Sequence, residues 1–116
     1  MRTDVVDAQT ARAARVFLDR IASSYAVSEA ILFGSRARRT HREDSDADIA
    51  VVIQGSHGKR STVALDMAGG AFEVLLSTGV LIEALPLWQD EFDHPEHFNN
   101  PALIEDIRRD GVRLRE

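Results

Sequence analysis

Two aspartates with one residue between them, Asp46 and Asp48, stand at the start of an apolar run that continues to Ile53. On an extended strand, residues i and i+2 project from the same face, so the two carboxylates would converge. Adjacent carboxylates repel one another unless a cation lies between them, and hard oxygen ligands suit Mg²⁺. Two such ions, roughly 3.5–4 Å apart, can hold the attacking and leaving oxygens of an in-line phosphoryl displacement. The spacing therefore predicts metal-assisted chemistry at a phosphate.

A second motif, Gly34-Ser35, precedes Asp46 by ten intervening residues. Glycine lets a backbone approach a phosphate closely, and the Ser35 hydroxyl lies beside amides that can face anionic oxygens. Four arginines, at positions 36, 38, 39 and 42, follow within seven residues. Such a cluster alone is typical of a solvated loop, but beside these motifs it predicts that Arg36 or Arg38 stabilises developing negative charge.

Apolar runs on either side of the arginine cluster predict the strands that carry these motifs. Residues 30–33 form a short run stopped by glycine, and the β-branched run 48–53 is the clearest strand in the sequence. An amphipathic helix is predicted over about residues 7–25, where apolar residues recur at helical spacing. The polar segment with the arginines therefore connects two strands.

A long helix is predicted in the middle of the chain. Ser61 or Thr62 can cap it, it extends to about Ser77, and Gly79 stands where a C-terminal stop is expected. Gly69-Gly70 predicts either a bend or another backbone packed closely against the helix. The apolar face is predicted to contain Val63, Met67, Phe72, Leu75 and Leu76.

Two segments have the composition of loops. Residues 55–60 are rich in glycine, and for His57 and Lys59 a solvated turn is favoured over contact with a phosphate. Residues 89–99 are acidic and are predicted to form a solvated loop, with contact to a basic partner as the alternative.

The last elements are predicted from apolar runs and caps. Residues 80–88 are expected to form a strand, which Pro86 would confine to a sheet edge or a bulge. A short helix follows, capped by Asn100 with Pro101 in its first turn, and residues 112–114 close as a strand or pack down. Alternating helices and strands predict an α/β (α+β mixed) fold, with helices flanking a small mixed β-sheet in two or three layers.

Composition limits the classes of protein. The chain has 116 residues, which fits a single domain over residues 1–116. A net charge of −5 argues against nucleic acid as the main partner. The chain has no cysteine, which excludes thiolate metal sites, and no apolar run of signal-peptide or membrane-spanning length. We therefore expect no membrane partner and a cytoplasmic location.

The two motifs together resemble the signature of the DNA polymerase β superfamily of nucleotidyltransferases. They look closest to the minimal nucleotidyltransferases (MNT) that pair with HEPN-domain proteins, whose segment is typically Gly-Ser-x-Ala-Arg-Gly, a spacer, then Ser-Asp-x-Asp. Here these stand as residues 34–39 (GSRARR) and 45–48 (SDAD), within a matching segment of residues 31–53. Arg39 stands where the family commonly has glycine. If that glycine allows positive φ, arginine would change the turn, and its charge would instead meet phosphate.

The resemblance implies a nucleotidyltransferase fold and a set of site residues. Gly34 and Ser35, with Arg36 and Arg38, would bind the phosphates of ATP, and Asp46 and Asp48 would be catalytic ligands of two Mg²⁺ ions. A neighbouring strand usually supplies a third catalytic and metal-binding carboxylate, for which the candidate is Glu83. The alternative is that Glu83 points to solvent from an edge strand.

The resemblance also implies an acceptor. Larger family members carry an additional domain for it, whereas this chain has no room for one, which favours a protein acceptor. The MNT resemblance implies that the acceptor is a tyrosine of a HEPN toxin and that the chain is the antitoxin, in a hetero-oligomer with the toxin. Two alternatives remain open: an antitoxin that neutralises by binding alone, and the catalytic subunit of a small-molecule nucleotidyltransferase.

Overall fold

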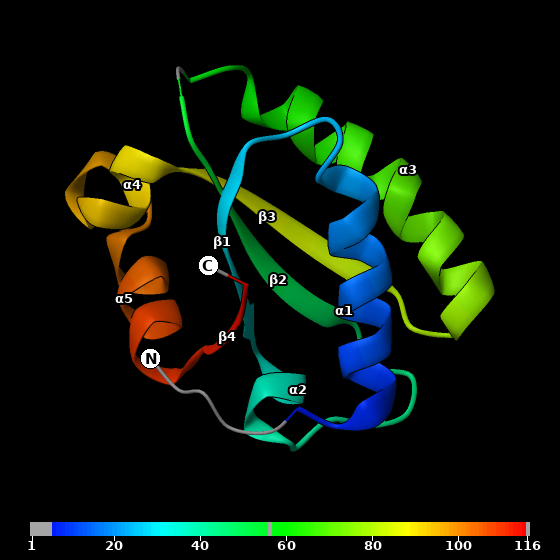
Figure 1. Ribbon diagram of the computed structural model, residues 1–116. Helices are drawn as coiled ribbons and strands as arrows, with labels where there is room; N and C mark the ends of the chain where they lie inside the picture. Colours follow the sequence, from blue (N-terminus) through cyan, green and yellow to red (C-terminus); the bar gives the residue numbers. More distant parts are fainter. Residues whose placement is uncertain (1–5, 56, 116) are drawn as a thin grey trace.

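The computed structural model describes residues 6–55 and 57–115. Within them, helices cover both faces of a four-stranded sheet with strand order β3-β2-β1-β4 (Figure 1). In chain order the elements are α1 (Ala8–Ile21), β1 (Val27–Phe33), α2 (Ser35–Arg38), β2 (Ala47–Ile53), α3 (Arg60–Thr78), β3 (Ile82–Trp88), α4 (Gln89–Asp93), a 3-10 turn η1 (Pro95–His97), α5 (Pro101–Asp110) and β4 (Val112–Arg115). The predicted mixed sheet flanked by helices is confirmed.

The sheet is mixed because only one pair of strands is parallel. β1 pairs antiparallel with both β2 and β4, whereas β2 pairs parallel with β3 across the connecting helix α3. β3 is an edge strand, as Pro86 predicted, because a proline has no backbone N–H to donate to a second neighbouring strand. The parallel pair brings the amino-terminal ends of β2 and β3 to the same end of the sheet.

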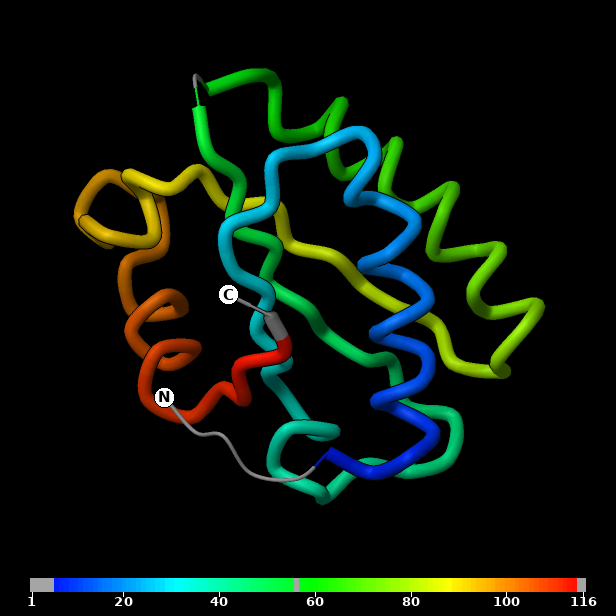
Figure 2. The backbone as a smooth tube through the Cα atoms, viewed as in Figure 1, coloured from blue at the N-terminus to red at the C-terminus, as the bar shows by residue number. Residues whose placement is uncertain are grey.

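Successive side chains of β2 point to opposite faces of the sheet and pack into two separate core layers. Ile49, Val51 and Ile53 face the layer of α1 and α3, whereas Ala50 and Val52 face the layer of α4, η1 and α5. Figure 2 shows α1 and α3 running beside each other on one side of the sheet, with the chain from α4 to α5 on the other. The domain therefore has three layers.

The long helix α3 differs from its prediction in the face that it buries. Its sheet-facing residues are Met67, Ala71 and Val74, whereas Phe72 and Leu76 are 56% and 72% exposed. A small residue such as Ala71 lets the helix axis approach the sheet closely, so the buried stripe is not the one with the largest side chains. The prediction that Phe72 and Leu76 belong to the buried face is wrong.

The ends and the middle of α3 were predicted with mixed success. The helix begins at Arg60, and Lys59 precedes it without a side-chain cap, so neither Ser61 nor Thr62 is the cap. Gly79 ends it in the left-handed conformation (φ 80°), as predicted. The Gly69-Gly70 pair lies within one continuous helix, and a Cβ at Gly70 would meet the Arg20 side chain rather than a backbone.

The C-terminal third contains more helix than expected. The predicted acidic loop contains α4 and η1, and Glu91 in α4 is only 3% exposed. The prediction for α5 is confirmed, since Asn100 Oδ1 accepts a hydrogen bond from the N–H of Leu103 at the helix start. Within the described ranges, no helix has both the length and the apolar character needed to cross a bilayer.

Candidate active site

The centre of the candidate site is a pair of carboxylates on the parallel strands. Asp48 of β2 and Glu83 of β3 are direct register partners, so they project from the same face of the sheet. Because Ile49 faces α1 and α3, Asp48 projects toward the opposite face. Glu83 is exposed and lies on the edge strand, yet it is the immediate neighbour of Asp48. Glu83 is therefore exposed on the edge strand, as the alternative predicted, and it lies beside Asp48; its role as a third metal-binding carboxylate stays a prediction.

The charges of the three acidic residues interact. Asp46 is exposed and lies one residue before β2. The pKa of the Asp48 carboxyl is raised, first by burial and then by the negative charges of Glu83 and Asp46, while Arg38 acts in the opposite direction. An excess of negative charge therefore gathers at this end of the sheet, where a cation would relieve it.

The donor chemistry of these residues fits Mg²⁺, but the ligands do not form a ready-made site. In residues 6–55 and 57–115, no group of three or more His, Asp or Glu side chains is arranged to hold a metal ion. Carboxylate oxygens are the donors that Mg²⁺ accepts, and an ion usually keeps several waters. Asp46, Asp48 and Glu83 would have to draw together around an ion that compensates their repulsion.

Gly34 lies directly against Asp48. It connects β1 to α2 with φ of 76°, and a Cβ atom built on it would lie 2.4 Å from Asp48 Oδ2. Glycine is therefore required both by the backbone conformation and by the space that the carboxylate occupies. Ser35 follows as the first residue of α2. The turn and the carboxylate pair thus form one continuous surface.

Arg36 has a different position from the one that a phosphate contact requires. Its side chain is 1% exposed, and it donates through Nε to the carbonyl of Ser45 (3.0 Å), through Nη1 to Thr10 Oγ1 (2.8 Å) and through Nη2 to the carbonyl of Glu43 (3.1 Å). These contacts attach the loop before Asp46 to α1. Every nitrogen of the guanidinium already has an acceptor in the protein, which favours a positioning role for Arg36 over nucleotide binding.

Of the two arginines predicted to bind phosphate, Arg38 is the accessible one. It is exposed, its charge acts on Asp48, and it borders a cavity of about 200 Å³ that also contacts Gly34 and α5. Arg39 caps α2 in the left-handed conformation, with φ of 60°. The expectation that an arginine here would change the turn is therefore wrong, because Arg39 itself adopts the positive φ that favours glycine.

A larger cavity, of about 370 Å³, lies between α3 and the edge strand β3. Its walls are mostly small and apolar, with two of the candidate carboxylates among them. The lining residues are Asp46, Ala64, Ala68, Ala71, Leu81, Ile82, Glu83 and Ala84. The sequence did not reveal this cavity, because alanines at helical spacing are equally typical of a plain packing face.

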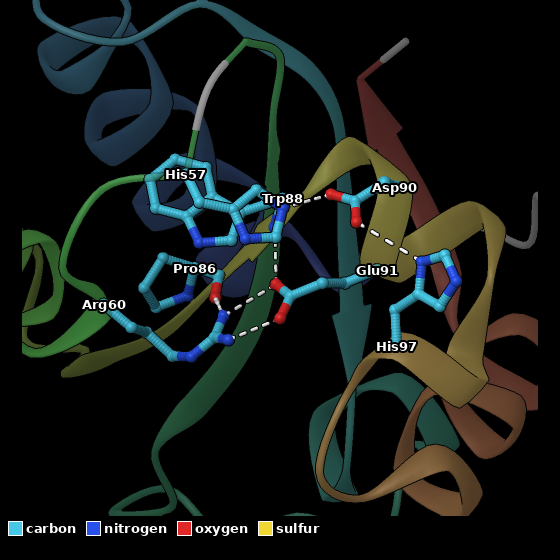
Figure 3. Close-up of polar contacts among 7 residues, drawn as sticks. All are labelled: His57, Arg60, Pro86, Trp88, Asp90, Glu91 and His97. Carbon is cyan, nitrogen blue, oxygen red and sulfur yellow. Dashed lines mark hydrogen bonds and ion pairs between the residues drawn. The ribbon is translucent and has the colours of Figure 1, made fainter.

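A buried polar cluster lies at the other end of the sheet, where β2 and β3 end (Figure 3). Glu91 accepts hydrogen bonds from Arg60 Nη1 (2.9 Å) and from the Trp88 N–H (2.9 Å), and Arg60 also donates to the carbonyl of Pro86. His57 pairs with Asp90 and stacks on Trp88 with the ring centroids 5.4 Å apart. A strand of this length places His57 roughly 20 Å from the carboxylate pair. His57 is exposed, as the favoured prediction of a solvated turn has it.

Comparison with known proteins agrees with this geometry. The family model described as "Polymerase beta, Nucleotidyltransferase" matches residues 18–80, more than half of the chain and the whole unit from β1 to α3. The chain therefore belongs to this nucleotidyltransferase family. Its general activity is nucleotidyl transfer.

One solved structure has the same fold. A crystal structure of a candidate nucleotidyltransferase from Sulfolobus solfataricus superposes with a TM-score of 0.54 over 90% of this chain and 78% of that chain, at 20% sequence identity. At this identity the likeness shows a shared fold alone. No curated protein matches the chain in sequence.

Proposed function

We propose that this domain transfers AMP from ATP to a protein hydroxyl, a tyrosine of a HEPN-domain toxin, and so acts as the antitoxin of a pair. The observation that carries the catalytic part is the position of Asp48, between Glu83 on the adjacent strand and Gly34 in the preceding turn. The cavity of about 200 Å³ beside Gly34 and Arg38 supports binding of phosphates next to this carboxylate pair. The partner follows from the resemblance of residues 31–53 to MNT proteins.

Each residue has a role in the proposed reaction. Gly34 and Ser35 face the β- and γ-phosphates, since the absence of a side chain at Gly34 keeps the approach to Asp48 open. Asp46, Asp48 and Glu83 would hold Mg²⁺, which when bound neutralises phosphate charge and orients the reacting oxygens. Arg38 stabilises charge that develops on the phosphates.

The transfer itself is an in-line displacement. Glu83 accepts the proton of the acceptor hydroxyl, whose oxygen forms a bond to the α-phosphorus while the bond from that phosphorus to the pyrophosphate oxygen breaks. The products are an AMP-modified hydroxyl and pyrophosphate. Asp46 is the more exposed carboxylate of the Asp-x-Asp pair, and Asp48 is the half-buried one.

The larger cavity supports an aromatic acceptor. Its apolar walls, formed by Ala64, Ala68, Ala71 and Ala84, suit a ring. Glu83 borders this cavity from the edge strand, but its side chain shares the opposite face with Asp48, so a bound hydroxyl would have to reach around the strand edge to meet it. A tyrosine side chain presents both a ring and a hydroxyl. An aliphatic hydroxyl would leave the apolar walls uncovered, so the cavity favours tyrosine over serine or threonine.

The test is intact-mass analysis of the HEPN protein after incubation with this protein, Mg²⁺ and ATP. We expect gains in whole AMP units, lost with Asp48→Asn and retained with Glu105→Gln, an exposed control on α5. Replacing the acceptor tyrosine by phenylalanine should remove the gain. If Asp46→Asn/Asp48→Asn still forms the complex and still neutralises the toxin, the protein is a binding antitoxin and the enzymatic proposal is wrong. Modification of a small molecule instead would establish the other alternative.

A further inference from the structure

The outer face of α3 carries an apolar stripe that nothing within the domain covers. Among the described residues, four large apolar side chains are exposed, and three of them lie on this stripe: Leu65 at 76%, Phe72 at 56% and Leu76 at 72%. Gly69 lies on the same stripe, and a Cβ atom there would meet nothing within 4 Å. The stripe is distinct from the buried face of α3, so folding of the single chain does not require it.

The spacing of the stripe is that of one half of a coiled coil. Leu65, Gly69, Phe72 and Leu76 are separated by four, three and four residues, which is the repeat of positions that face a partner helix. α3 has 19 residues, which corresponds to roughly 28 Å of helix. The stripe therefore predicts a helix as the partner.

We propose that α3 pairs antiparallel with α3 of a second copy of this chain. A two-fold axis between Gly70 and Ala71 brings Leu65 opposite Leu76 of the second copy and Gly69 opposite its Phe72. The protruding Phe72 ring then enters the notch that Gly69 leaves, and the reciprocal contact is identical. Such self-complementarity is what a two-fold interface requires, and it is not expected of a stripe that binds an unrelated surface.

Acidic residues on one side of the stripe act against this pairing and limit its strength. Asp66 and Glu73 flank one side, and two copies would bring these acids near each other. Glu73 pairs with Arg20, which offsets its charge, whereas the Tyr25 hydroxyl that donates to Asp66 leaves the charge of Asp66 in place. The other side is flanked by Ala68 and Leu75, which are apolar.

The pairing also affects the larger cavity. Ala68 lines that cavity and flanks the stripe, so the second α3 would run along the cavity rim. With three large side chains for each copy, the contact is at the small end of specific interfaces, and self-association in the micromolar range is expected. The pairing does not require nucleotidyl transfer, so it can fail without the proposed function, although it would narrow access to the cavity that we assign to the acceptor.

The first experiment is analytical ultracentrifugation of the full chain, whose monomer mass is 12.9 kDa. We expect the mass to rise toward that of two chains with concentration. Phe72→Glu should weaken association at least about tenfold, since it buries a charge. Gly69→Leu should do the same, although it adds an apolar group, because it fills the notch. Ala102→Glu, exposed on α5, is the control and should change nothing.

Orientation can be tested because the chain has no cysteine. A mixture of Leu65→Cys chains and Leu76→Cys chains should form a disulfide-linked dimer on mild oxidation, whereas neither variant alone should do so. Cross-linking of either variant alone would indicate parallel pairing and overturn the proposal. A chain that stays monomeric at hundreds of micromolar, or tighter association of Gly69→Leu, would also overturn it; binding of only a different protein to the stripe would identify another occupant.

Discussion

Gly34 lies in direct contact with the carboxylate of Asp48: a Cβ atom on residue 34 would lie 2.4 Å from Asp48 Oδ2. A side chain at residue 34 must therefore displace the carboxylate or the turn. The contact joins the end of β1 to the start of β2. A change in the backbone of the Gly-Ser turn should therefore also move the carboxylate of Asp48.

Gly34→Ala should therefore abolish nucleotidyl transfer and lower the free energy of unfolding by about 1–2 kcal/mol, because alanine is strained at φ of 76°. Gly55→Ala is the matched control, since Gly55 has φ of 101° and nothing within 4 Å of an added Cβ. It should lose no more stability than Gly34→Ala in urea unfolding, and it should keep its activity. Equal activity losses in both variants would mean that the Gly34–Asp48 contact has no specific importance.

Asp48→Asn should stabilise the metal-free protein while it abolishes activity. Burial, Glu83 and Asp46 raise the pKa of Asp48. Ionisation of Asp48 therefore lowers the free energy of unfolding as pH rises from the ordinary pKa of 3.8 through the folded pKa. At pH 7 the substitution should therefore raise the free energy of unfolding. Thermal unfolding with EDTA and with millimolar MgCl₂ measures this, and Mg²⁺ should stabilise the parent more than the variant. A destabilised variant in EDTA would contradict the assigned electrostatics.

Arg36→Met should lower stability by about 2–4 kcal/mol, since it leaves Thr10 and two loop carbonyls without their donor. Arg38→Ala should leave stability within about 0.5 kcal/mol, because an exposed side chain is removed. Urea unfolding and ATP titration of the folded proteins separate the two roles. We expect Arg38→Ala to weaken ATP binding more than Arg36→Met does, and the reverse order would assign Arg36 to the nucleotide.

Glu91→Gln should alter the acid stability of the protein. Burial alone would raise the pKa of Glu91, but hydrogen bonds from Arg60 and the Trp88 N–H lower it overall. A carboxylate with a lowered folded pKa stabilises the fold above its ordinary value of 4.5, and this stability is lost as pH falls through the folded pKa. The parent should therefore lose stability below about pH 4.5 more steeply than Glu91→Gln. Denaturant unfolding between pH 3 and 7 checks this, and parallel curves would be evidence against the ion pair.

Elements with local signals were predictable from the sequence. β2 follows from its β-branched run, the start of α5 from Asn100, and the end of α3 from Gly79, because each depends on residues within a few positions. The proximity of Asp46 to Asp48 follows in the same way from strand geometry. The pairing of Asp48 with Glu83 needed the resemblance as well, since strand order depends on contacts far apart in the chain.

Elements defined by distant contacts were not predictable. Phe72 and Leu76 have the size of core residues, and only the closeness of the sheet to Ala71 shows that they face outward. Glu91 looked like part of a solvated acidic loop because its partner, Arg60, is the first residue of α3, far from it in the sequence. Arg36 stands in a motif that predicted a contact with phosphate. Its side chain instead donates a hydrogen bond to Thr10 in α1, which is distant in the sequence.

The parallel pairing of β2 and β3 has a consequence for the order of events during folding. Asp48 and Glu83 are separated along the chain by the whole of α3, and they meet only after that helix has closed the crossover between the two strands. Closing such a loop has an entropic cost that a partly formed sheet does not recover. A nascent chain that ends within α3 would present Asp46 and Asp48 without Glu83, so capture of ATP by the growing polypeptide would have to wait for β3.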